Sequence, residues 1–174
     1  MTSSATRPYW RSADAPVRQV PDAELSWAVA ILAGLLSGAL ATLVFQEGTL
    51  ALLHRWGPDF PVLAALFGAV PRPFSLDPAS PFGLPHLVVE MAWGGLWGIV
   101  LAALICRGRR VPALATGVTY SVVVIGSLIL VILPALRGMP LVFAEVPRLV
   151  RLTLLLCAAW GWGTALLLKL ISRR

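Results

Sequence analysis

The chain has 174 residues, of which 58% are hydrophobic and only 13% are charged. A typical soluble domain is nearer one half apolar and one quarter charged. A chain of this length also has too small an interior to hide the excess apolar surface from water. The composition therefore excludes a soluble globular enzyme, a disordered tail and a secreted disulfide scaffold, and it predicts an integral membrane protein.

The formal net charge is +6, and the basic residues gather at the ends of apolar segments, as in 107–110 and 169–174. This placement is typical of membrane topology signals and of contacts with lipid headgroups. No basic stripe is interleaved with exposed aromatic residues, so we expect the lipid bilayer and no nucleic acid as a partner.

Residues 1–24 are polar and predict a flexible cytoplasmic tail without packed structure. Residues 25–174 predict a single transmembrane domain. Its apolar segments are each long enough to cross a hydrocarbon core of about 30 Å as a helix, and they lie at about 25–46, 86–106, 111–136 and 147–170. The predicted fold class is an all-α integral membrane protein, a four-transmembrane-helix bundle.

The longest connection, residues 47–85, contains seven of the fourteen prolines. Its first part, 47–56, is compatible with an extension of the first helix, and Gly57 and Pro58 then break it. The apolar stretch 61–70 is too short to cross the bilayer, which predicts a short interfacial or re-entrant helix. The remainder is predicted to be extended and rich in turns.

Four spans place both termini on one side of the membrane. The tail, the 107–110 turn and the C-terminal end carry more Arg and Lys, over fewer residues, than the opposite side does. Because basic residues favour the cytoplasmic side, we expect both termini in the cytoplasm and the segment 47–85 outside, which in a bacterium is the periplasm.

Small residues recur at helical spacing within the spans. Because these residues have small side chains or none, two helix backbones can approach closely. Helices in a membrane associate in this way without a hydrophobic driving force. We expect most of these small residues to lie at contacts between helices of the same chain. The alternative is that one small-residue face stays uncovered and binds a second copy of the chain or a larger membrane complex. The candidate helix-packing residues are Gly34, Gly38, Gly94, Gly98, Gly161 and Gly163.

Four tryptophans lie inside the spans rather than in the interfacial positions that tryptophan prefers. They are Trp93, Trp97, Trp160 and Trp162. An indole N–H near the middle of a bilayer needs a hydrogen-bond partner. We expect Trp–Gly packing between the second and fourth spans. The alternative is an aromatic-walled pocket for a quinone, a lipid tail or a pigment.

Ionisable side chains are costly in apolar surroundings and mark candidate sites. His86 and Glu90 are four residues apart and share one helix face, and Glu47 and His54 share another if 47–56 is helical. All four belong to the outer side. We interpret them first as interfacial residues at a helix start, with a metal or proton-accepting cluster as the speculative alternative. Their spacing matches no specific metal motif, so no cofactor is predicted.

Thr116, Tyr120 and Ser127 are predicted to line one side of the third span. They would line the path if the chain were a small oligomeric transporter or channel. No catalytic motif is present, neither a nucleophile elbow nor a phosphate-binding loop nor a Rossmann fingerprint. We therefore expect no enzyme activity.

Several short strings occur together in one order: ALATLVFQ (Ala39–Gln46), ALLHRWG (Ala51–Gly57), PFGLP (Pro81–Pro85) and WGGLWGIV (Trp93–Val100). This set resembles a group of small uncharacterised four-pass inner-membrane proteins of proteobacteria, over about residues 30–105. In related sequences a histidine often follows the phenylalanine that is Phe45 here, whereas this chain has Gln46. The resemblance implies a bacterial inner-membrane location and assigns no residue roles.

Three functions are compatible with these features. The first is a structural or accessory helix bundle that packs with itself or with a larger membrane complex. The second is a small oligomeric transporter or channel. The third is a membrane enzyme or a metal-, quinone- or lipid-binding protein that uses the outer His and Glu residues or the tryptophan pocket. The sequence favours the first.

Overall fold

The computed structural model describes residues 27–79, 83–107, 112–139 and 147–171. Within these ranges the chain is mostly helical. Four helices in them are long and apolar enough to cross a bilayer, which confirms the predicted helical class. The predicted tail 1–24 lies outside the described residues.

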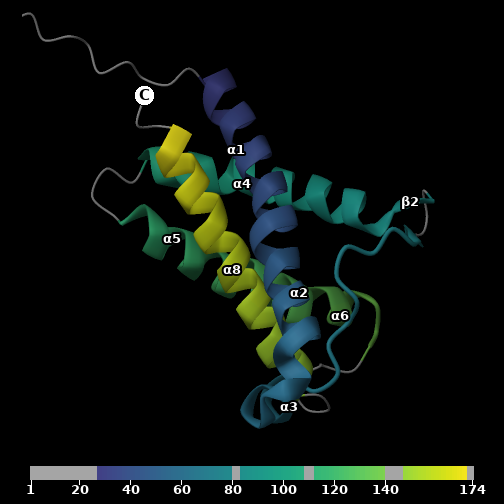
Figure 1. Cartoon of the computed structure of the whole chain (residues 1–174). Helices are drawn as coiled ribbons and strands as arrows, with labels where there is room; N and C mark the ends of the chain where they lie inside the picture. The colour runs from purple at the N-terminus through teal and green to yellow at the C-terminus, as the bar shows by residue number, and fades with distance from the viewer. Residues whose placement is uncertain (1–26, 80–82, 108–111, 140–146, 172–174) are drawn as a thin grey trace, which may run out of the picture.

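The first span is one continuous helix that changes its winding near the middle. It consists of α1 (Trp27–Ala41), a π-helical segment η1 (Thr42–Gln46) and α2 (Glu47–Trp56). Figure 1 shows α1 and α2 in line. The predicted extension through 47–56 is thus helical. A short 3-10 turn η2 (Gly57–Asp59) follows and contains Pro58, which has no N–H to continue the α-helix.

The connection after the first span is folded back along α2. The short helix α3 (Pro61–Phe67) begins with a proline in its first turn and ends at Gly68, whose φ of +67° suits glycine. An extended stretch then leads to a small antiparallel pair, β1 (Pro78–Ala79) with β2 (Leu84–Pro85).

The three remaining spans agree closely with the sequence segments. They are α4 (His86–Arg107), the composite third helix of α5 (Ala113–Tyr120), η3 (Ser121–Ile125), η4 (Leu128–Ile132) and α6 (Leu133–Leu136), and α8 (Pro147–Ile171). The third helix contains two π-helical segments, η3 and η4.

These π-helical segments correct one expectation about the third span. Tyr120 is buried, whereas Ser127 is exposed, and the Thr116 hydroxyl donates to the carbonyl of Pro112 at 3.2 Å. The three hydroxyls therefore do not form one polar face. The physical reason is that a π-helix has more residues per turn than an α-helix, so positions seven apart no longer share a side.

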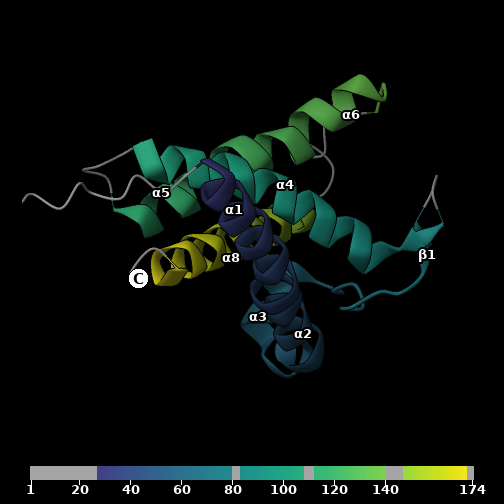
Figure 2. The same ribbon diagram turned by 90° about the horizontal axis from the view of Figure 1, so that it is seen from above.

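The helices pack in an open arrangement rather than in a parallel bundle. In Figure 1, α8 runs beside α1 and α2 in the opposite direction, and α4 crosses α1. The helix α5 packs against α8. Figure 2 shows α6 on the side of the molecule away from α2 and α3. The beginning of α1 and the end of α8 lie at the same end of the structure.

Glycines form the closest helix contacts. A methyl group added at Gly34 would lie 2.7 Å from the carbonyl oxygen of Gly98, and one added at Gly38 would collide with the backbone of Gly94. The first and second spans therefore meet backbone to backbone. On α8, Gly161 lies against Gly117 of α5 and the neighbouring Ser121. All of these contacts are within the chain.

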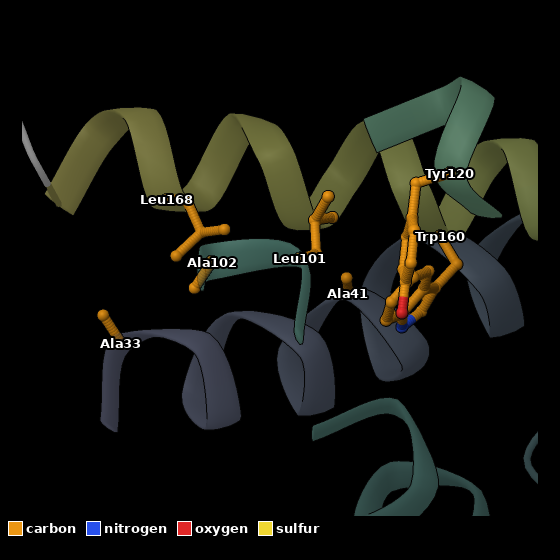
Figure 3. Packing of buried hydrophobic residues seen from close by; sticks show 7 residues of the cluster. All are labelled: Ala33, Ala41, Leu101, Ala102, Tyr120, Trp160 and Leu168. Carbon is orange, nitrogen blue, oxygen red and sulfur yellow. The ribbon is translucent and has the colours of Figure 1, made fainter. Parts of the chain in front are cut away.

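Small and apolar side chains fill the space that these contacts define. Figure 3 shows the cluster, which takes residues from α1, α4, α5 and α8. Its members are Ala33, Ala41, Leu101, Ala102, Tyr120, Trp160 and Leu168. Many large apolar side chains lie on the outer surface instead, as in Leu32, Leu36 and Leu96.

The substitution Gly38→Ala should destabilise the protein by about 1–3 kcal/mol, because the added methyl group overpacks a backbone contact. The matched control is Gly48→Ala in α2, where no heavy atom of a neighbouring element lies within 4 Å of an added Cβ. That control should be neutral or stabilising by about 0.5–1 kcal/mol, since alanine favours helix. Thermal unfolding in detergent, followed by circular dichroism, measures both. Equal stability of the two variants would contradict the close packing.

Candidate functional site

A cavity of about 440 Å³ lies where α2, α4, α8 and the extended segment 71–77 come together. One part of its lining is polar and includes Gln46, Glu47, Arg72, Asp77, His86 and Glu90. The other part is apolar and is built by Leu50, Leu149, Leu152 and Leu156. We call this the outer cavity. Its size falls in the range typical of ligand pockets, and it combines apolar walls with a few charged groups.

Two glutamates from different spans meet in the outer cavity. Glu47 is the first residue of α2, and Glu90 lies in the second turn of α4. Both carboxyl groups line the outer cavity, and Glu90 lies close enough to Glu47 for their charges to influence each other. Oε1 of Glu90 also lies 3.2 Å from Nε2 of His86, which is one helical turn earlier in α4. The site thus brings two carboxyl groups and one imidazole together.

Glu47 also holds the extended segment in place. Its side chain is buried, with 4% of its surface exposed, and Oε2 accepts a hydrogen bond of 2.5 Å from the backbone N–H of Phe74. Phe74 has a φ of +54°, which is unfavourable for a residue with a bulky side chain. A second contact joins Nδ1 of His54 to the carbonyl oxygen of Val70 at 3.1 Å. A carbonyl only accepts, so this nitrogen carries the proton.

The structure brings together three of the four ionisable residues that the sequence singled out. Glu47, His86 and Glu90 line the outer cavity, whereas His54 is exposed and faces the Val70 carbonyl. Glu47 and His54 share a helix face, but that face binds the extended segment. Over the described ranges, no group of three or more His, Cys, Asp or Glu side chains is placed to hold a metal ion.

The sequence did not identify Gln46, Arg72 and Asp77 as parts of a site. Arg72 and Asp77 belong to an irregular segment whose position depends on contacts with α2, so no periodic pattern could reveal them.

Two arginines of α8 help to fix α3 nearby. Nε of Arg151 donates to the carbonyl of Leu66 at 2.9 Å, and the Arg148 side chain lies against Gly68.

A smaller space of about 80 Å³ lies deeper between the helices. We call it the inner chamber. Its lining comprises Thr42, Gln46, Glu90, Gly94, Trp97, Ile125, Cys157 and Trp160. Gln46 and Glu90 line both spaces, so they stand at the boundary between them.

The four tryptophans have different environments. Trp97 and Trp160 line the inner chamber, and Nε1 of Trp160 donates to the carbonyl oxygen of Gly38 at 3.1 Å. Trp160 also lies beside Gly94 of α4. Trp93 and Trp162 are exposed, although Trp162 makes an edge-to-face contact with Phe45 at 5.5 Å between ring centres.

Comparisons with known proteins identify no relative from which a function could be inferred. No family model, no curated protein and no solved structure matches the chain. A function for this chain therefore has to follow from the geometry and chemistry of its cavities.

Replacing Glu47 by alanine should release the extended segment, because the Phe74 N–H loses its acceptor. A hydrogen bond to a charged group contributes about 1.5–3 kcal/mol, so the Phe74 amide should exchange with solvent deuterium about tenfold faster or more. Glu47→Gln keeps a carbonyl acceptor and should change the rate much less. Hydrogen–deuterium exchange with mass spectrometry measures this. Identical exchange in wild type and Glu47→Ala would show that the contact does not hold the segment, and Asp59→Ala serves as the exposed acidic control.

Proposed function

We propose that the chain is a four-pass protein of a bacterial inner membrane, with both termini in the cytoplasm and the outer cavity open toward the periplasm. The four long apolar helices support insertion. The excess of basic residues in the tail, the 107–110 turn and the C-terminal end supports the orientation. The resemblance carried by strings such as Trp93–Val100 supports the bacterial inner membrane.

Within this membrane, the proposed function is to bind a small organic cation in the outer cavity. The observation that carries the proposal is the meeting of Glu47 and Glu90, from two spans, at one cavity wall. Asp77 adds a third carboxyl group, against the single guanidinium of Arg72 among the described lining residues. Acidic side chains thus outnumber basic ones in this lining even when His86 is counted, and an excess of acidic groups attracts cations.

The apolar part of the lining supports an organic ligand. The leucines at positions 50, 149, 152 and 156 would contact carbon atoms, while the carboxyl groups would bind an ammonium group. The volume of about 440 Å³ accommodates a small amine together with some water. The ligand class proposed is therefore a short-chain alkylammonium ion.

The sequence favoured an accessory bundle that associates through its glycine faces, and the packing shifts this preference. Gly34, Gly38, Gly94 and Gly98 are buried against each other within the chain, and Gly161 and Gly163 are buried against Gly117 and Phe45. A protein partner would have to use other surfaces. The outer cavity is the feature that gives a function a definite chemical basis.

The proposed orientation predicts where fused reporters are found. A fluorescent protein that folds only in the cytoplasm should be fluorescent when it follows Arg174. A phosphatase that is active only in the periplasm should be active when it follows Ala79, between β1 and β2. Exchanging the two reporters should abolish both signals. The opposite pattern would reverse the proposed topology and leave the helix assignments unchanged.

Cation binding is testable by ligand-dependent thermal stability. A ligand at 100 times its Kd stabilises the folded state by about 2.7 kcal/mol. Butylammonium chloride should therefore raise the unfolding temperature of the purified protein, relative to sodium chloride at the same concentration. Butan-1-ol, which has the same carbon chain without the charge, should not.

The matched variants for this experiment are Glu90→Gln and Asp59→Asn. Glu90→Gln removes a charge from the cavity and should weaken butylammonium binding by about tenfold or more, since a partly desolvated ion pair contributes over 1 kcal/mol. Asp59 is an exposed acidic residue that is not part of the described cavity lining, and its variant should bind as wild type. Equal stabilisation by butylammonium and butan-1-ol would refute a charge-based site.

A further inference from the structure

We propose that the inner chamber is a second binding site, which accepts a single ammonium group from the outer cavity between Gln46 and Glu90. This inference rests on the proposed function, because the outer cavity supplies the cation. It adds a second position for the charged group, deeper between the helices, and it assigns a role to Trp97 and Trp160.

The two spaces share lining residues, and this supports the inference first. The Gln46 and Glu90 side chains line both cavities and come from two different helices. Gln46 is the last residue of the π-helical segment η1, and Thr42, its first residue, lines the chamber. Short π-helical segments within α-helices are frequent at functional sites. One Glu90 carboxyl group is therefore available to a cation on either side of the boundary.

The chemistry of the chamber lining supports the ligand class. Oxygen acceptors are provided by the carboxyl group of Glu90, the side-chain amide of Gln46 and the hydroxyl of Thr42. The Thr42 hydroxyl donates its proton to the carbonyl of Gly38 at 3.1 Å, so its oxygen keeps the capacity to accept. No Arg, Lys or His is among the described lining residues. The lining thus favours a positively charged donor of hydrogen bonds.

The aromatic walls and the size are consistent with the same ligand. Indole rings attract a cation that lies over their faces, and Trp97 and Trp160 both line the chamber. A volume of about 80 Å³ corresponds to about two or three water molecules at roughly 30 Å³ each. An ammonium group with one water molecule has this size, whereas a whole alkylammonium ion would leave its carbon chain in the outer cavity.

The chamber ends at a packed layer. Trp160 donates to the Gly38 carbonyl, and Gly94 lies directly against Trp160. Farther along α4 and α8, Leu101 and Ala165 are completely buried. Neither Leu101 nor Ala165 is among the described lining residues of either space, and we therefore treat the inner chamber as the second of two binding positions.

Cys157 provides a native probe, because it lines the chamber. The protein would first carry Cys106→Ala, which removes the exposed second thiol. We expect Cys157 to react with the cationic reagent 2-aminoethyl methanethiosulfonate about tenfold faster than with the anionic 2-sulfonatoethyl reagent, since the acidic path concentrates cations. Butylammonium should slow the reaction, and mass spectrometry of the intact protein gives the rates.

Two variants make the result decisive. Glu90→Gln should reduce the preference for the cationic reagent several-fold. A cysteine at position 165, introduced as Ala165→Cys with Cys157→Ala, lies in the packed layer and should stay unmodified. The proposal of an inner site would be overturned if Cys157 reacted equally fast with the two reagents. It would also be overturned if Cys157 reacted no faster than the cysteine at position 165. The outer site is judged separately, because its butylammonium-dependent thermal stabilisation does not require access to Cys157.

Discussion

The close contact between the first and second spans at Gly38 and Gly94 determines the geometry of the rest of the molecule. With no side chains between them, the two backbones approach closely, and the Gly38 carbonyl accepts the hydrogen bond of Trp160 from the fourth span. This junction of three helices fixes where each helix lies along its neighbours. Glu90 is one helical turn before Gly94, and Glu47 lies about two and a half turns after Gly38 on the crossing helix. Their meeting is therefore a consequence of the glycine contact.

The π-helical segment η1 lies between this junction and the outer cavity. It begins at Thr42, whose hydroxyl bonds to Gly38, and it ends at Gln46, beside Glu47. Carboxyl groups are expensive in apolar surroundings and persist there only with partners. Glu47 has the Phe74 N–H, and Glu90 has His86. The irregular proline-rich segment is thus attached to the spans through the same residue that forms the site.

The sequence predicted the features that depend on local patterns. Hydropathy located the four long helices, and the spacing of four residues placed His86 next to Glu90. The features it missed depend on contacts distant in the sequence or on irregular winding. Arg72 reaches the cavity because Glu47 holds Phe74, and no periodicity records that contact. The predicted polar face containing Ser127 was wrong, because extrapolation at 3.6 residues per turn fails across the π-helical segments η3 and η4.

The two halves of the structure place a physical condition on any transport activity. Charged residues line the outer cavity, whereas Leu101 and Ala165 are completely buried in the packed layer at the other end of these helices. Release toward that side would require α4 to move relative to α1 or α8. At this contact the backbones of Gly34 and Gly98 meet directly, while the Thr42 side chain lies against Gly94 and the Leu35 side chain against Gly95. Sliding of α4 along α1 would therefore have to displace these two side chains. The Trp160 hydrogen bond to Gly38 resists such movement by joining α8 to α1. Under the proposed function, release toward that side would therefore require this bond to break as well.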